Sequence, residues 1–222
     1  MQKVKGFLEF VNESLELHLQ AMSERTSAKR LAELALSGDR LVRHAVAANP
    51  NTPSDTLSLL ASDDLFKVRA SVAANPNTPK ETLASLLSEH DNSGEIQKSI
   101  AGNPSAPIDL LYRLGQHKQW SVRAAVAANP NINKEILHKL ILDFDTDVAE
   151  AAVKNPKAGR EELELASKNS HWFVRAAVAS DSKTPAEILI KLAEDPEKYV
   201  RETAEGNPNW PKDITDWALG DW

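Results

Sequence analysis

The chain has 222 residues, no cysteine and a net charge of −6, from 26 Lys and Arg against 32 Asp and Glu. The lack of cysteine excludes disulfides, thiolate nucleophiles, cysteine-ligated zinc and iron–sulfur clusters, and the acidic balance disfavours generic nucleic-acid binding. No N-terminal apolar run resembles a signal peptide and no stretch is long enough to span a bilayer, so we expect a cytoplasmic protein.

The first 26 residues predict an amphipathic helix. Its apolar residues share a helical spacing: Phe7, Leu8, Val11, Leu15 and Leu19. We expect residues 1–26 to form a capping helix over the first repeat. Leu31 and Leu34 already match the leucine positions of a half unit, so the repeat array begins near Ser27.

The remainder of the chain repeats itself with a period of 26 residues, apart from one step of 28. Each of the seven units opens on a β-branched residue: Val42, Val68, Ile96, Val122, Val148, Val174 and Val200. A fixed period of this length is typical of a solenoid, in which each unit buries its apolar face against its neighbours. No linker interrupts the array, so we expect residues 27–222 to form a single elongated domain.

Each unit predicts two helices. The opening residue and those three and four positions later share one helical face, and the Ala-rich composition favours helix over the strand that the alternation in Val68, Ala70 and Val72 would also suit. An Asn-Pro pair then ends the first helix in six units, with Asn expected in the left-handed conformation. Asp181-Ser182 replaces that pair in the sixth unit.

The second helix is predicted to begin at a Thr-Pro pair, with Thr52, Thr78 and Thr184 as N-caps and an acid in the first turn. That acid is present in every unit, and the helix dipole explains it better than a metal ladder does. A leucine column follows and is predicted to be core: Leu57, Leu83, Leu111, Leu137, Leu163 and Leu189.

An arginine column provides the candidate partner-binding residues, together with two tryptophans at the helix starts: Arg43, Arg69, Arg123, Arg175, Arg201, Trp120 and Trp172. Stacked guanidinium groups can bind phosphates or an acidic peptide. The alternative is an internal ladder, in which the arginines pair with Asp63, Asp143 and Asp195. We favour internal pairing because the chain is not basic. The aromatic side chains can likewise form a binding patch or pack a loop onto the core.

No catalytic, cofactor-binding or metal-binding residues are expected. The six histidines fall in different columns, and no two share a ligand spacing on one helix. The sequence contains neither a glycine-rich phosphate loop nor a nucleophile elbow.

The unit V-R-x-A-V-A-x-N-P-x-T-P-x-x-x-L-x-x-L resembles the leucine-rich repeat variant (LRV) family, most closely in VRASVAANPNTPKETLASLL of the second unit. The resemblance covers about residues 27–222. It implies an all-α, right-handed α-solenoid of about seven 26-residue repeats, with α-helices alternating with short or 3₁₀ helices. Some family members carry a Cys-rich iron–sulfur domain, and nothing of that function applies to a chain without cysteine.

These observations predict a noncatalytic scaffold that binds a protein or peptide along one face. The alternative is a nucleic-acid-binding or DNA-repair-type helical-repeat protein that uses an Arg-lined groove. That alternative requires a basic groove, and the excess of acidic residues argues against one.

Overall fold

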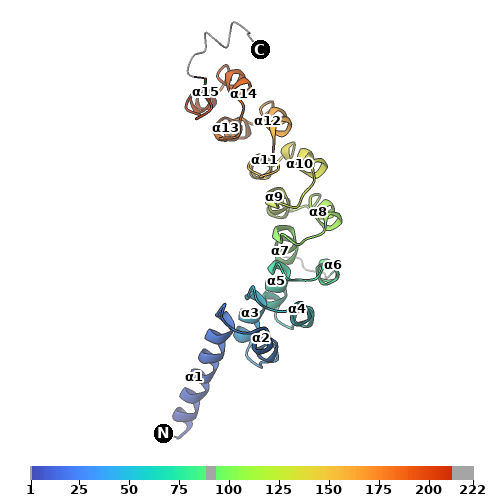
Figure 1. The fold of residues 1–222 in the computed structure, drawn as a ribbon, viewed down its shortest axis with the longest axis vertical. Coiled ribbons are helices and arrows are strands. Elements are labelled where there is room, and N and C mark those ends of the chain that lie inside the picture. Colours follow the sequence, from blue (N-terminus) through green and yellow to red (C-terminus); the bar gives the residue numbers. More distant parts are fainter. Residues whose placement is uncertain (1, 89–93, 212–222) are drawn as a thin grey trace. The chain divides into compact units, whose positions relative to one another are not determined.

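A computed structural model describes residues 2–88 and 94–211 of the chain, and the secondary structure of these residues is α-helical without a strand (Figure 1). The helices form two compact units, residues 1–110 and 111–222. None of the described helices is both long and apolar enough to cross a membrane. The prediction of an all-α helical-repeat fold is confirmed.

The first unit contains one long helix followed by pairs of short ones. The helices are α1 (Gln2–Met22), α2 (Ala28–Leu34), α3 (Arg40–Ala48), α4 (Ser54–Leu60), α5 (Phe66–Ala74), α6 (Lys80–Ser88) and α7 (Glu95–Gly102). The first helices of successive repeats pack side by side, α3 on α5 and α5 on α7, and α1 packs on α3. The odd-numbered helices therefore form one layer, to which the even-numbered helices add a second.

The second unit continues the same pattern. Its helices are α8 (Ile108–Leu114), α9 (Trp120–Ala128), α10 (Lys134–Ile141), α11 (Thr146–Val153), α12 (Arg160–Ala166), α13 (Trp172–Ser180), α14 (Ala186–Leu192) and α15 (Lys198–Glu205). Helices α9, α11, α13 and α15 pack in succession. The second helices of the repeats have seven to nine residues and are α-helical, so the 3₁₀ geometry implied by the family resemblance is absent from the described residues.

Helix α1 contacts the array through a different face from the one its apolar spacing indicates. Ala21 is fully buried, and His18 Nδ1 lies 3.2 Å from the Leu41 carbonyl oxygen. Leu15 and Leu19, by contrast, are 54% and 58% exposed. The side chains of Phe7 and Leu8 lie outside the described part of the chain.

The core consists of the columns that the periodicity predicts. All seven opening residues, from Val42 to Val200, are fully buried, and the leucine column from Leu57 to Leu189 is at most 1% exposed. These columns are buried in every repeat, including those with a neighbour on both sides, so each repeat supplies apolar surface that its neighbours cover.

The Thr-Pro pairs do not cap the second helices as predicted. Helix α4 begins at Ser54 after Pro53, and Thr52 lies one position too early to be its N-cap. The Thr52 hydroxyl instead donates to the Val46 carbonyl oxygen at 2.5 Å, and the same bond recurs at Thr78 and Thr184. Each of these threonines thus satisfies a carbonyl at the C-terminus of the preceding helix.

Candidate functional site: a polar ladder and an aromatic edge

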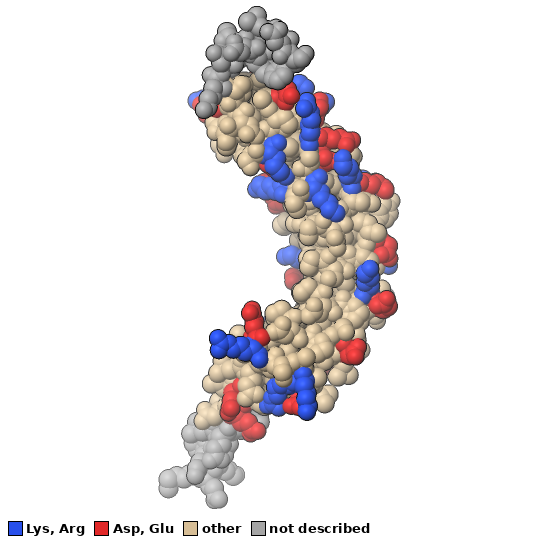
Figure 2. Space-filling view, viewed as in Figure 1, with Lys and Arg blue, Asp and Glu red and all other residues tan. Residues whose placement is uncertain are grey.

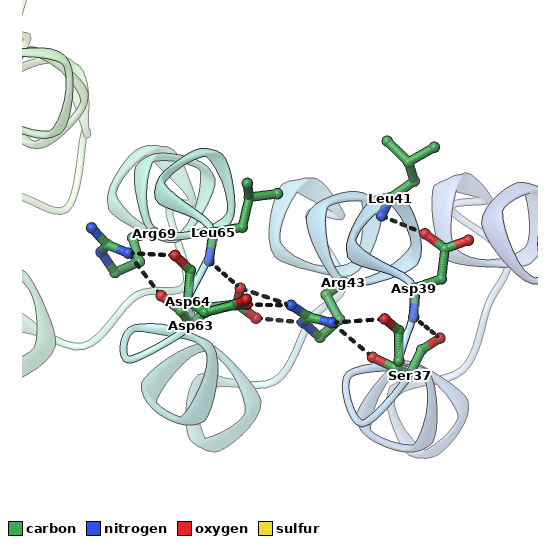
Figure 3. Close-up of polar contacts among 9 residues, drawn as sticks. Ser37, Asp39, Leu41, Arg43, Asp63, Asp64, Leu65 and Arg69 are labelled. Carbon is green, nitrogen blue, oxygen red and sulfur yellow. Dashed lines mark hydrogen bonds and ion pairs between the residues drawn. The ribbon is translucent and has the colours of Figure 1, made fainter.

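The arginine column forms an internal ladder between repeats. Figure 3 shows Arg43 between the loop that precedes its own helix and the loop of the next repeat. Arg43 Nη2 donates to Asp63 Oδ1 at 3.1 Å, and its Nε donates to the other oxygen of the same carboxylate. Arg123 makes the corresponding two bonds to Asp143 at 2.7 and 2.9 Å, and Arg175 makes them to Asp195 at 2.6 and 2.8 Å. These three pairs have the bidentate geometry that a guanidinium and a carboxylate favour.

All five arginines of the column also bind the loop that precedes their own helix. In all five, Nη1 donates to the backbone carbonyl six residues earlier, at distances of 2.6 to 3.0 Å. The acceptors are the carbonyl oxygens of Ser37, Asp63, His117, Asn169 and Asp195. Each arginine therefore satisfies backbone oxygens that the helix itself leaves unpaired.

The aspartates of the ladder have a second structural role. Oδ1 of Asp63, Asp143 and Asp195 accepts from the backbone N–H two residues later, at 2.8 to 2.9 Å, which fixes the turn into the next helix. The hydrogen bond from Arg175 holds the pKa of Asp195 below its usual value. Burial raises the pKa of Asp63, but the hydrogen bonds from Arg43 and from the Leu65 N–H outweigh it and leave the pKa lowered.

The gaps in the arginine column coincide with gaps in the carboxylate column. Ala149 replaces Arg in one repeat, and twenty residues later Asn169 replaces Asp. Asn169 still accepts from the backbone N–H of His171 at 2.9 Å, and its Nδ2 donates to the Ile141 carbonyl oxygen at 3.1 Å. Gln97 and His117 show the same joint replacement. In the five repeats for which the structure describes both positions, arginine and aspartate are therefore present or absent as a pair.

An asparagine ladder runs beside the arginines. Asn75 Nδ2 donates to the carbonyl oxygens of Ala47 and Asn49 in the preceding repeat at 2.8 and 2.9 Å, while its Oδ1 accepts from the Asn77 N–H at 3.0 Å. The same donor contacts to the preceding segment occur at Asn49, Asn103, Asn155 and Asn207. The left-handed conformation predicted for these residues is wrong, since no described residue other than Gly94 has a positive φ.

The sixth repeat shows how the asparagine is replaced. Asp181 occupies the position, and a carboxylate has no hydrogen to donate. Two residues later, Lys183 Nζ donates to the carbonyl oxygens of Asn155 and Ala158 at 3.1 and 3.2 Å. The lysine thus provides a donor to the Asn155 carbonyl oxygen, one of the two that an asparagine in this column would reach.

The candidate partner-binding arginines are consequently not free surface groups. The side chains of Arg43, Arg123 and Arg175 are only 14%, 5% and 12% exposed. Of the two interpretations of the column, internal pairing is the one these three residues adopt. On the face drawn in Figure 2, Lys and Arg alternate with Asp and Glu over the described surface and form no continuous basic stripe.

Five aromatic side chains lie at or just before the starts of the odd-numbered helices of the second unit. We call this surface the aromatic edge, and it comprises Trp120, Phe144, Trp172, Phe173 and Tyr199. Phe144, Tyr199 and Phe173 are 80%, 61% and 55% exposed. The Trp172 ring stacks on Phe173, with centroids 3.7 Å apart, and meets Tyr199 edge-on at 5.8 Å. Trp120 is 48% exposed and Trp172 is half-buried.

The ladder supports this edge directly. The Arg123 guanidinium lies 4.5 Å from the centroid of the Phe144 ring, and its Nε also donates to Asp143. Sequence reasoning had not singled out Phe144, because it stands alone in its repeat column. Its only sequence signal is its position next to Asp143.

Comparison with known proteins identifies the repeat. The family model for the Leucine Rich Repeat Variant domain matches residues 67–130, and that for the Leucine rich repeat variant matches residues 40–65. A solved structure described as "a leucine-rich repeat variant with a novel repetitive protein structural motif" matches with a TM-score of 0.57 and 25% identity, over 82% of this chain and 72% of that one. Residues 40–130 therefore carry leucine-rich repeat variant repeats, and the solved structure matches the helical-repeat fold over most of the chain. No curated protein matches it.

Within this LRV array, the residues that recur from repeat to repeat have identifiable structural roles. Val and Leu form the core, Asn and Thr satisfy backbone carbonyls, and Arg joins adjacent repeats. The aromatic side chains are not part of the repeating unit, because they occur in some repeats and not in others. They are therefore the residues that distinguish this array from a generic one.

Proposed function

We propose that this LRV protein is a noncatalytic scaffold that binds another protein or a peptide through the aromatic edge. The observation that carries the proposal is that Phe144, Phe173 and Tyr199 are all exposed and lie at or just before the starts of α11, α13 and α15, the first helices of consecutive repeats. Aromatic residues are enriched at protein interfaces, and exposed apolar clusters on soluble domains mark interaction sites.

Preorganisation supports the same conclusion. Two Arg–Asp pairs of the ladder, Arg123 with Asp143 and Arg175 with Asp195, fix the loops from which the aromatic residues project. A partner that docks on a rigid edge loses less conformational entropy in the protein than one that must order a loop. In this proposal Trp120 and Trp172 contact the partner, and the arginines support the surface that it contacts.

The nucleic-acid alternative fits the geometry less well. Bidentate phosphate binding needs two guanidinium nitrogens, and in Arg123 and Arg175 Nε and Nη2 bind carboxylates while Nη1 binds backbone carbonyl oxygens. A phosphate would have to displace Asp143 or Asp195 from a buried pair. Arg43 is engaged with Asp63 in the same way.

The test compares proteins captured from host lysate by the tagged wild type and by two matched variants, with nuclease-treated samples throughout. The double variant Phe173→Ala/Tyr199→Ala removes two aromatic rings of the edge. Tyr112→Ala is the control, since Tyr112 is 42% exposed on α8, away from the edge.

We expect the wild type and the control to retain a specific partner that the double variant loses. That partner, once identified, is then titrated as a purified protein against all three. Equal affinity for the double variant and the wild type would refute the aromatic edge. Capture that nuclease abolishes would instead support the nucleic-acid alternative.

A further inference from the structure

Helices α10 and α12, from adjacent repeats, bring one histidine and two glutamates together. His138, Glu161 and Glu162 each offer one potential ligand atom, and these atoms all lie within 4.8 Å of one another. The closest pair is His138 Nε2 and Glu162 Oε1, at 2.9 Å. This group lies on the even-numbered helices and is separate from the aromatic edge.

One of the three ligands is already fixed. The Glu162 side chain is 1% exposed, and its Oε2 accepts at 2.9 Å from the N–H of Gly159, the N-cap residue of α12. This bond holds Oε1 toward His138. The side chains of Glu161 and His138 are 66% and 34% exposed, so they can adjust around the fixed oxygen.

A cationic group already occupies the position in front of the two carboxylates. Lys134 Nζ lies 3.1 Å from Glu161 Oε2 and 3.5 Å from Glu162 Oε1. The lysine side chain is 65% exposed on a flexible stem and is free to swing into solvent. Two carboxylates carry one more negative charge than a single ammonium balances, and a divalent cation would neutralise both.

We propose that His138, Glu161 and Glu162 bind a divalent transition-metal ion, with Lys134 as the competing cation. One imidazole nitrogen and two carboxylate oxygens form a ligand set that suits Zn²⁺, Co²⁺ or Ni²⁺ better than Ca²⁺ or Mg²⁺, which favour oxygen ligands alone. Three protein ligands leave a further position for water. The bound ion would link α10 to α12 and so join two successive repeats.

The test titrates the full chain with ZnCl₂ by calorimetry and follows Co²⁺ binding by its visible absorption. Because the loss of a direct metal ligand costs at least as much affinity as the loss of a residue that only orients a ligand, we expect His138→Ala and Glu161→Gln each to weaken binding by at least about tenfold. Glu135→Gln is the matched control, since Glu135 is an exposed glutamate of α10 that pairs with Lys139.

A substitution of Lys134 tests the competition between the lysine and the metal ion. Lys134→Met removes a positive charge about 4 Å from the ion, so we expect it to strengthen Zn²⁺ binding by about five- to tenfold. Zn²⁺ should also raise the melting temperature of the wild type, because an ion that binds only the folded state stabilises it. Circular dichroism verifies that each variant is folded.

Three results would overturn the proposal: no heat and no thermal shift with millimolar Zn²⁺, unchanged affinity in His138→Ala, or no gain of affinity in Lys134→Met. The proposal is independent of the partner-binding function, since the aromatic-edge variants leave all three ligands in place.

Discussion

Breaking one rung of the Arg–Asp ladder should destabilise the protein without removing any apolar side chain from the core. In Arg123→Ala, the buried Asp143 carboxylate loses both guanidinium bonds, and the carbonyl oxygens of His117 and Lys118 lose their donor. Both side chains of the pair are at most 8% exposed. Removing one partner of a buried ion pair costs about 3–5 kcal/mol, because the other charge remains in a poorly solvated site.

The chain itself contains the compensating change. One repeat later, Ala149 stands in place of Arg and Asn169 in place of Asp, and Asn169 donates to the Ile141 carbonyl oxygen. The double variant Arg123→Ala/Asp143→Asn copies this arrangement and removes the orphaned charge. We therefore expect it to be less destabilised than Arg123→Ala alone, by about 1–3 kcal/mol.

Urea unfolding of the wild type, both single variants and the double variant provides the measurement. If the effects of the two substitutions simply add, or if Arg123→Ala stays within about 0.5 kcal/mol of the wild type, the pair does not act as a structural rung. The arginine would then be available for a partner after all.

Three further outcomes are expected. Leu137→Ala should cost about 2–5 kcal/mol in urea unfolding, because Leu137 is fully buried; a cost below about 1 kcal/mol in a folded variant would contradict its core position. Asn75→Asp should lower the free energy of unfolding by about 1–3 kcal/mol, because it removes the donor to two buried carbonyl oxygens. Adding Asn77→Lys should restore part of this stability, because Lys183 provides a donor beside Asp181 in the same way. Thermal melts that show no gain in the double variant would refute this compensation. The folded-state pKa of Asp195 lies below its ordinary value of 3.8, so the ionised carboxylate contributes its full stabilisation above pH 3.8 and loses it as the pH falls below that value. The free energy of unfolding, measured from pH 5 to pH 2, should therefore fall less steeply in Asp195→Asn than in the wild type. An equal fall in both proteins would contradict this role of Asp195.

The core was predictable because the periodicity of the sequence reports it directly. The column of Val122 is β-branched in all seven repeats and the column of Leu137 is leucine in six of them, at fixed offsets, as burial against neighbouring repeats requires. The pairing of Arg175 with Asp195 was also predictable from the sequence, because the two residues belong to oppositely charged columns at a separation of twenty residues.

The polar details were not predictable from local signals. Asn75 and Thr78 look like helix stop and start residues, because those are the common local roles of the two residue types. Their actual hydrogen-bond partners are carbonyl oxygens: Thr78 bonds Val72 in the preceding helix, and Asn75 bonds Ala47 in the preceding repeat. Local sequence rules cannot identify a partner that lies one repeat away.

The same limit explains why the histidine–glutamate group was missed. His138 and Glu162 are 24 residues apart, in different columns of consecutive repeats, whereas ligand spacings along one helix connect residues only three or four positions apart. Stacking of α10 on α12 brings them together. In a repeat protein, side chains separated by nearly one period are spatial neighbours, and ligand pairs should be sought at that separation as well.

The ladders also restrict where this protein can recognise a partner. The repeated polar groups that would ordinarily form a binding face are engaged within the array, as the bonds of Arg123, Asn75 and Thr78 show. In the proposed function, recognition therefore depends on side chains that vary between repeats and remain exposed. Phe144, Phe173 and Tyr199 meet both conditions, and substituting them leaves the ladder bonds in place. Stability and binding should therefore be separable in this chain: substitutions in the ladder lower the free energy of unfolding, and substitutions on the aromatic edge lower affinity.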